Sequence, residues 1–399
     1  MRPRAKSDFP SPSKLLLVAV AGAALALGCM TNPVTGKTEF GFVSEQQEIQ
    51  IGEQYYSPTR QEQGGDYTVD PELSAYVSEV GQKLAKVSQR PSLPYEFVVI
   101  NNTVPNAWAL PGGKIAVNRG LLLALENEAQ LAAVLGHEIV HAAARHGAKS
   151  MERGVLLQSA VAGTQIATGG SQWASLAVQS AGLGAQLTSL KYGRDAERES
   201  DKYGIEVMQR AGYDPRAAIR LQEIFVELSN NQEPDWLSGL LASHPASQER
   251  VENNRKDVEK LLTKGGAPGE LYAERYQRTI ARLRRSQDAY AAADRGREAL
   301  VEGNVGEALR LANQAIAIEP REARFHELRG DARLAEDRYE EAVTNYNRAI
   351  ERDESYFRPY LLRGVARDKL GDRADARADI ESSYRLYPLP QIQQLLSGS

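Results

Sequence analysis

The sequence predicts an α+β protein: a mainly helical domain with a small β-sheet, followed by an all-α solenoid of repeated helix pairs. Three observations support this prediction. Apolar residues recur at helical spacing in several segments, two strand-like runs flank a Pro-Gly-Gly turn, and the last third repeats with a period of 34 residues. At 399 residues, with ordinary apolar and charged fractions, the chain has room for two or three domains.

The N-terminus has the features of an export signal. A basic stretch ends at Lys14, and the apolar run that follows, residues 15–27, is too short to span a bilayer. Residues 26–29, Ala-Leu-Gly-Cys, resemble a bacterial lipobox, in which the cysteine is acylated and the chain is cut just before it. Residues 1–28 are therefore predicted to be a lipoprotein signal peptide. The alternative is an ordinary cleavage site followed by a small buried Cys29.

The lipobox also predicts a location. Met30, rather than Asp, follows the cysteine, and by resemblance to the lipoprotein sorting rule this favours the outer membrane of a double-membraned bacterium. We therefore expect a periplasmic protein that is anchored to the outer membrane by a lipidated Cys29. The formal net charge of −4 is mildly acidic and argues against nucleic acid as a partner.

Two helices are predicted before the strands. Residues 29–68 are polar and turn-rich, and Ser44 begins a capping-box pattern, so we expect a tether and a short helix there. Asp70 and Pro71 supply an N-cap and a first-turn proline for an amphipathic helix, whose apolar residues would face a core.

A small sheet is predicted directly before a buried helix. Residues 95–100 have the composition of a strand, and residues 108–110 and 114–117 flank the Pro-Gly-Gly turn as a hairpin. Residues 127–145 then form a largely apolar helix, which we expect Gly147 to break.

The first domain is predicted to end at a linker. Residues 153–194 are rich in Ala, Gly, Ser and Gln and predict two pliable helices joined by a turn. More helical segments follow, and residues 264–269 are the clearest linker in the chain. These observations place the first domain at 69–264 and a linker with a lead-in helix at 265–288.

The remaining residues are predicted to form three tetratricopeptide repeats over 289–390, with a C-terminal tail at 391–399. Small residues recur at two positions with the 34-residue period: Gly296, Gly330 and Gly364, and Ala308, Ala342 and Ala376. Such positions let two antiparallel helices approach closely, and stacked pairs form a concave surface suited to a peptide or partner protein. The alternative is a helical domain that only stabilises the fold.

The chemistry of the first domain is indicated by an HExxH motif. His137 and His141 are four residues apart on a helix, so both imidazoles can bind one zinc ion, and Glu138 can reach a water molecule on that zinc. Two ordinary core histidines are the alternative, which the helical context disfavours. One Zn²⁺ per chain is the predicted cofactor.

A third zinc ligand is expected later in the chain. The elongated motif HExxHxxGxxH is excluded because its third histidine would fall on Gly147, one residue after His146. His146 is thus expected to be an outer-sphere or surface residue. Residues 153–194 contain no His, Asp or Glu, so nothing in that stretch can bind the metal.

Two carboxylates follow that stretch at helical spacing. Glu197 and Asp201 lie one turn apart on one face, which suits Glu197 as the ligand and Asp201 as a carboxylate behind the ligands. Glu199 points elsewhere. The alternative is a solvated run of charges.

Together these motifs resemble the bacterial HtpX-like and BepA-like metallopeptidases related to the CAAX prenyl proteases. The resemblance covers residues 32–262 and rests on HEIVH, the Glu197-to-Asp201 pair, NAWALPGGKIAVNRGLL at 106–122 and Ser-His-Pro around His244. It implies a zincin-type peptidase domain with Glu197 as the third ligand. The repeats and the export signal make the periplasmic BepA-like branch the nearer relative.

The predicted function is that of a zinc endopeptidase of the cell envelope. Glu138 would take a proton from the zinc-bound water, which then attacks a peptide carbonyl. The strand near residues 106–110 could be an edge to which an extended substrate adds; ordinary sheet packing is the alternative. Expected substrates are unfolded or misassembled outer-membrane or periplasmic proteins, and the repeats could bind outer-membrane assembly machinery. A second hypothesis is a chaperone-like scaffold whose protease stays largely latent.

His244 is the last candidate for the site. Pro245 disfavours a helix at His244, and Ser247 can cap the helix that follows. A loop histidine held beside a helix start could take the open zinc position as a latch, or donate a hydrogen bond to the developing oxyanion. The alternative is a surface histidine with a capping role.

Overall fold

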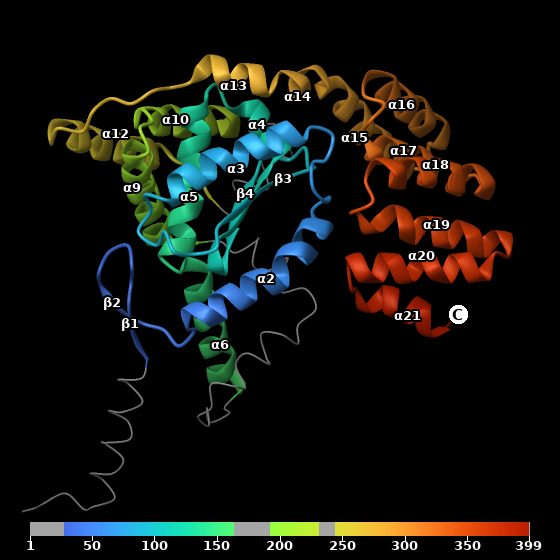
Figure 1. Cartoon of the computed structure of the whole chain (residues 1–399), viewed down its shortest axis with the longest axis horizontal. Helices are drawn as coiled ribbons and strands as arrows, with labels where there is room; N and C mark the ends of the chain where they lie inside the picture. Colours follow the sequence, from blue (N-terminus) through green and yellow to red (C-terminus); the bar gives the residue numbers. More distant parts are fainter. Residues whose placement is uncertain (1–27, 163–191, 231–243, 399) are drawn as a thin grey trace, which may run out of the picture.

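The computed structural model describes residues 28–162, 192–230 and 244–398. The predicted signal peptide, apart from residue 28, and most of the predicted helix pair at 153–194 lie outside these residues. Figure 1 shows a helical body around one central helix, with a row of stacked helix pairs beside it. The predicted α+β class, with a small sheet and a helical repeat region, is confirmed. No helix within the described ranges is long and apolar enough to cross a membrane.

The N-terminal segment is structured where a tether was predicted. Strands β1 (Cys29–Thr31) and β2 (Thr38–Phe40) form an antiparallel hairpin. The amide of Asn32 holds this hairpin against the body by donating a hydrogen bond to Glu199 at 2.9 Å. The following helix α2 (Glu45–Glu62) has the predicted Ser44 capping box, but at 18 residues it is not short.

The central sheet has three strands, β3 (Glu96–Ile100), β4 (Ala107–Leu110) and β5 (Lys114–Asn118). The order is β3-β5-β4, with β3 parallel and β4 antiparallel to β5, so the predicted hairpin is confirmed and β4 is an edge strand. The hairpin turns through the 3₁₀ segment η1 (Pro111–Gly113). Gly112 has a φ of 77°, and a Cβ there would lie 2.6 Å from a backbone atom of α2, so only glycine fits.

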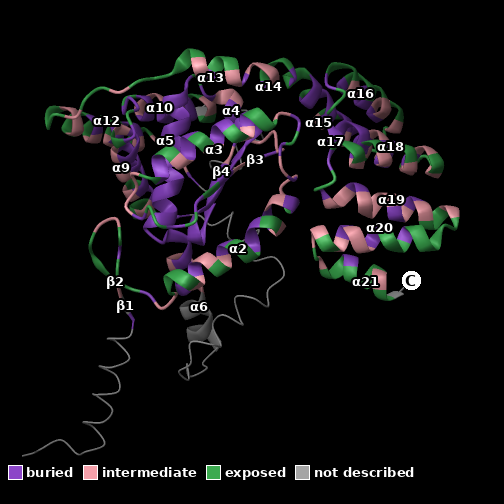
Figure 2. Cartoon of the chain, viewed as in Figure 1, coloured by how far each residue is buried: buried purple, intermediate pink, exposed green. Residues whose placement is uncertain are grey.

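The central helix α5 (Glu128–Ala143) is buried along its whole length (Figure 2). It packs among α3 (Pro71–Ala85), the sheet and the helices that follow, and the short α4 (Arg119–Ala124) before it contacts β5. The Asp70 cap and Pro71 begin α3 as predicted. The predicted break at Gly147 is wrong: the chain turns at Arg145, whose φ is 64°, and α6 (His146–Ala162) already includes Gly147. Arg145 is held in this conformation by contacts with Glu48 and the carbonyl of Val43.

Two helices, α9 (Arg194–Arg210) and α10 (Ala217–Asn230), pack against α5, and α12 (Gln248–Thr263) packs on both of them. The approach of α9 to α5 is close because glycines meet at the crossing. A Cβ on Gly204 would lie 3.0 Å from the backbone nitrogen of His137. This contact brings the carboxylates of α9 toward the histidines of α5.

The C-terminal region consists of helix pairs that stack in a row, as predicted. Two short helices, α13 (Ala273–Thr279) and α14 (Ala281–Arg285), lead into it. The pairs are α15 (Gln287–Val301) with α16 (Val305–Ile318), α17 (Ala323–Ala335) with α18 (Tyr339–Arg352), and α19 (Phe357–Leu370) with α20 (Arg373–Leu386). A Cβ on Gly330 would lie 2.7 Å from the Tyr346 ring, which explains the small residue at that repeat position. The predicted tail is a further helix, α21 (Pro390–Gly398).

The repeats and the body share one hydrophobic core. A continuous cluster of buried side chains runs from Tyr67 in the body to Leu328 in α17, and it includes residues of the segment predicted as a linker and lead-in helix. Polar contacts cross the same boundary. The hydroxyl of Thr103 donates to Asp294 at 2.6 Å, and the Arg119 guanidinium lies 3.4 Å from the Tyr290 ring centroid. The repeats are therefore packed firmly against the body.

Candidate metal centre

The two motif histidines lie side by side on α5. Helical spacing places His137 and His141 on one face, and their Nε2 atoms are 3.0 Å apart. Both side chains are buried. Two imidazole nitrogens at this separation require a proton or a cation between them, because their lone pairs would otherwise repel.

Glu197 of α9 reaches the same point. One of its carboxylate oxygens lies 3.3 Å from Nε2 of His141, and the other lies 3.5 Å from Nε2 of His137. Asp201, one turn later, contacts Nδ1 of His137 at 3.0 Å, which leaves the opposite nitrogen free to bind a metal. Glu199 points away from this cluster toward His146 and Asn32.

His244 lies inside the cluster and is only 5% exposed. Its Nδ1 is 3.0 Å from Glu197 and 3.3 Å from Nε2 of His137, and its Nε2 is 3.6 Å from Glu138. Ser247 caps α12 as expected, by accepting a hydrogen bond from the Arg250 backbone, and this cap holds the loop just before it. His244 thus contacts both a candidate ligand and the candidate base.

Arg250 is a site residue that the sequence motifs did not reveal. Its guanidinium donates two hydrogen bonds to Asp201, at 2.8 and 2.7 Å, and lies 3.1 Å from Glu197. Burial would raise the pKa of Asp201, but Arg250 lowers it to about 2. A local signal existed, because Arg250 lies in the first turn of α12, where the helix dipole disfavours a positive charge.

His146 and Tyr192 also border the cluster. His146 is buried, and its Nδ1 lies 2.9 Å from Nδ1 of His141, so it is the predicted outer-sphere residue rather than a surface residue. The ring of Tyr192 stacks on His141 at a centroid distance of 4.0 Å. No motif pointed to Tyr192, because it lies in the stretch 153–194, which contains no His, Asp or Glu.

The charges around the cluster favour one bound cation. Burial alone would lower the pKa of His137, but Glu197 and Asp201 outweigh burial and raise it to about 10. Burial lowers the pKa of His141 well below its usual range. Burial would raise the pKa of Glu197, but His244 and His137 hold it well below its usual range. The cluster therefore stabilises one positive charge and resists a second.

The residues present fit a metal ion. One ligand atom from each of His137, His141, Glu197 and His244 lies within 4.8 Å of the other three, and all four residues are buried. Two or three imidazoles with one carboxylate form a donor set that suits zinc. Burial raises the pKa of Glu138, and one of its buried oxygens makes no hydrogen bond to the described residues. Glu138 is thus free to exchange a proton beside the cluster.

Comparisons with known proteins find similar metallopeptidases. A model of peptidase family M48 matches residues 71–258, and a TPR repeat model matches residues 330–371. The chain is 27% identical to the beta-barrel assembly-enhancing protease of Escherichia coli (strain K12), over 84% of this chain and 74% of that protein. It is 30% identical to the mitochondrial metalloendopeptidase OMA1 of Schizosaccharomyces pombe, over 62% of this chain and 73% of that protein.

Solved structures that are similar to the chain include the second TPR of Spaghetti (RPAP3) bound to an HSP90 peptide. It is 32% identical, covers 27% of this chain and 97% of that chain, and has a TM-score of 0.26.

Proposed function

This chain belongs to peptidase family M48 and is a metalloendopeptidase, and we propose that it uses zinc to degrade misfolded or misassembled proteins of the bacterial outer membrane and periplasm. The observation that carries the proposal is the convergence of His137, His141 and Glu197 on one point, with Glu138 beside it. The name of the Escherichia coli relative, a beta-barrel assembly-enhancing protease, supports outer-membrane proteins as the substrate class.

His137, His141 and Glu197 would hold one zinc ion. When bound, the ion would polarise the scissile carbonyl and make a water molecule more acidic. Asp201 fixes the ring of His137 through Nδ1, and Arg250 fixes Asp201 in turn. These contacts hold the ligands in position before a substrate arrives.

Glu138 would act as the general base and then as the general acid. It is buried beside the cluster, and burial raises the pKa of its carboxyl, which makes the carboxylate a stronger base. A proton accepted from water by Glu138 can then pass to the leaving amine.

An extended substrate would bind along β4. Within the described residues β4 pairs only with β5, and a substrate strand that displaced what now buries its other edge would extend the sheet there. Only a segment that is not already folded can pair in this way. This requirement supports unfolded or misassembled proteins as substrates.

We further propose that the protein is tethered to the outer membrane through acylated Cys29, and that the repeats bind substrates or assembly machinery. Cys29 begins β1, which is the first strand of the hairpin that contacts α9 through Asn32. An acyl chain on Cys29 would therefore keep the catalytic domain close to the membrane surface. The repeats present stacked helix pairs of the kind that bind peptides.

A second candidate function is a chaperone-like scaffold with a largely latent protease. The position of His244 favours it, because its Nδ1 lies 3.0 Å from Glu197 and 3.3 Å from His137. A histidine at that point could occupy the metal position that water needs for hydrolysis.

The test of the enzymatic proposal is Glu138→Gln. This variant should bind as much zinc as the parent, because Glu138 is a base and not a ligand. Its cleavage of an unfolded protein should fall by about 10²- to 10⁴-fold, the usual contribution of a general base. Zinc content by atomic emission and cleavage by gel assay measure the two effects. Full activity in Glu138→Gln would refute the proposal.

Two further variants check the ligand assignment in the same assay. Glu197→Ala should lose zinc, whereas the matched variant Glu199→Ala should retain it, because Glu199 contacts His146 rather than the cluster. Equal zinc retention in both variants would move the third ligand to another residue.

A further inference from the structure

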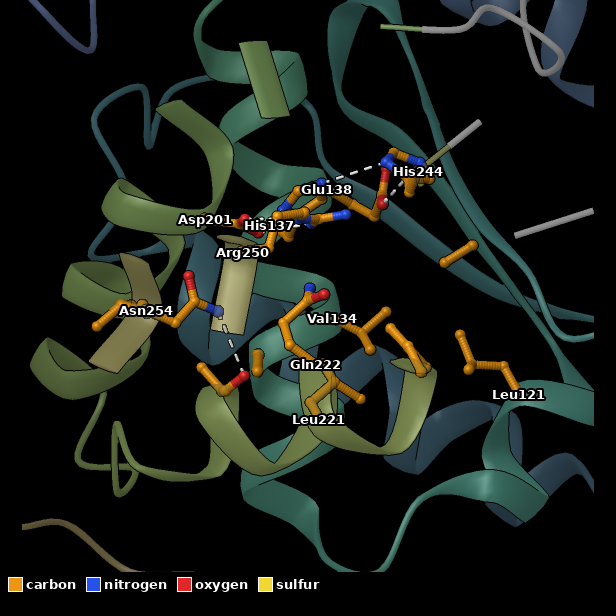
Figure 3. A pocket seen from close by; sticks show the side chains of 15 residues that line it. Leu121, Val134, His137, Glu138, Asp201, Leu221, Gln222, His244, Arg250 and Asn254 are labelled. Atoms are coloured by element: carbon orange, nitrogen blue, oxygen red, sulfur yellow. Dashed lines mark hydrogen bonds and ion pairs between the residues drawn. The ribbon is translucent and has the colours of Figure 1, made fainter. Parts of the chain in front are cut away.

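A small pocket extends from the metal centre into the apolar interior (Figure 3). His137 and Glu138 lie at one end of it in Figure 3 and Leu221 of α10 at the other, and Phe225 of α10 also lines it. Any substrate side chain that enters the pocket must therefore belong to a residue next to the bond being cut. The pocket is thus placed to select substrates by that side chain.

The walls of the pocket disfavour a charged side chain. Most of the lining is apolar, contributed by residues such as Leu121 and Val134. Asp201 and Arg250, which form an ion pair in the lining, already neutralise each other through two hydrogen bonds. A lysine or glutamate side chain would lose its hydration there, and neither charge of this ion pair is free to compensate that loss.

Two buried amide side chains in the pocket each have an oxygen that accepts no hydrogen bond from the described residues. Gln222 of α10 is 4% exposed, and its buried Oε1 makes no hydrogen bond to any described residue. Asn254 of α12 is 2% exposed; its amide nitrogen donates to the Ala218 carbonyl at 3.3 Å, which leaves its buried Oδ1 without a donor. In Figure 3 the amide of Gln222 points from α10 toward the side where His137 and Arg250 lie. Buried amides of this kind need a partner from elsewhere.

The size of the pocket limits what can fill it. Its cavity volume is about 40 Å³, which is more than the space that one water molecule needs, so a small side chain of a few non-hydrogen atoms fits. Threonine and asparagine side chains have this size and also carry a neutral hydrogen-bonding group. Valine and leucine have nearly the same shapes but would leave the amides unpaired.

We propose that this pocket selects substrates with a small, uncharged, hydrogen-bonding side chain, threonine or asparagine, at one position beside the scissile bond, and that Gln222 determines this selection. The proposal rests on the peptidase function proposed above. It predicts a preference of about 10- to 100-fold for asparagine over leucine and for threonine over valine, because the apolar residue would leave a buried amide unsatisfied.

The experiment maps cleavage sites in an unfolded protein that need not be the physiological substrate. A reduced and alkylated protein is digested by the parent, by Gln222→Met and by Gln287→Met, and the residues on both sides of each cut are identified by mass spectrometry. Methionine matches glutamine in shape but cannot hydrogen-bond as an amide does. The control residue Gln287 is exposed on α15, far from the pocket in sequence and structure. We expect the parent and Gln287→Met to prefer Thr and Asn at one flanking position, and Gln222→Met to prefer Val and Leu.

Binding supplies a readout that does not depend on turnover or on the folding of the Gln222 variant. Two peptides that span a mapped site and differ only by Asn or Leu are titrated into zinc-loaded Glu138→Gln. The Leu peptide should bind about 10-fold or more weakly. Equal binding, a parent preference for apolar residues, or an unchanged preference in Gln222→Met would overturn the proposal. Cleavage without any preference would refute the role of the pocket in selection but not the peptidase function. The absence of zinc-dependent cleavage would refute both proposals.

Discussion

His244 is the site residue for which two opposite roles are proposed. It contacts the candidate ligands His137 and Glu197 through Nδ1 and faces Glu138 through Nε2. A neutral imidazole in this place can act as a fourth metal ligand. It can also donate a hydrogen bond to an oxyanion once it has moved off the cluster.

The two roles of His244 predict opposite effects of His244→Ala. If the latch dominates, the variant should cleave an unfolded protein faster than the parent, because the metal position is open. If oxyanion stabilisation dominates, turnover should fall by about 10²-fold or more with zinc retained. Initial rates and zinc content of the two proteins distinguish these outcomes. Unchanged rates would show that His244 has neither role.

Sequence alone could identify some site residues and not others. His137, Glu138 and His141 could be predicted because one helix sets their spacing, and Glu197 because the preceding stretch offers no other ligand. The first-turn position of Arg250 is unusual for a positive charge, but neither Arg250 nor Gln222 could be placed at the site from the sequence. Their contacts depend on how α9 and α10 pack against α5 and how α12 packs on both, and local spacing carries no information on that packing.

At the scale of single elements, the end of a helix can be predicted only where it depends on neighbouring residues. Ser44, Asp70 and Ser247 can be identified as caps because a cap depends on a few neighbouring residues. The predicted break after α5 falls on a glycine, the residue that usually ends a helix. Arg145 ends it instead, because distant partners on α2 hold its side chain and offset the cost of its left-handed backbone.

Helix α17 contains a histidine that should make stability depend on pH. His326 is 3% exposed, its Nε2 lies 3.1 Å from the Pro320 carbonyl, and its buried Nδ1 makes no hydrogen bond to the described residues. Burial lowers the pKa of His326 to about 4, from an ordinary value of 6.5.

The sign of this effect follows from proton uptake. As pH falls from 6.5 toward 4, the unfolded chain protonates at His326 and the folded chain does not, so the free energy of unfolding decreases across that window. His326→Gln removes this contribution, and urea denaturation at several pH values should show a shallower dependence for the variant. Parallel curves for the two proteins would contradict the assignment.

At the scale of the whole molecule, the shared core predicts cooperative unfolding. All three tryptophans of the chain precede the repeats in the sequence, and Trp108 of β4 is buried in the body, so tryptophan fluorescence carries no signal from residues of the repeats. Far-ultraviolet circular dichroism is weighted toward helices everywhere, including the repeats. Because buried residues of both regions belong to one cluster, the two signals should change at the same urea concentration.

A substitution in the repeats should therefore destabilise the body. Tyr290 is 2% exposed, stacks under Arg119, and donates a hydrogen bond to Glu322 at 2.6 Å. Tyr290→Ala should lower the free energy of unfolding by about 3–5 kcal/mol, as for other large buried aromatic residues. The tryptophan transition should shift together with the dichroism transition. A shift in dichroism alone would show that the two regions unfold independently.

The shared core also decides which mutant alleles are informative in a bacterial strain. A stop codon after Gly266 would remove Tyr276, Leu283 and Tyr290, whose rings and chains cover the apolar face of the body. The shortened product would expose that face and be cleared by cellular proteases, so its phenotype would resemble that of a full deletion. Missense alleles that change only exposed side chains of the repeats, compared with Glu138→Gln, are the ones that can separate a scaffolding defect from a proteolytic one.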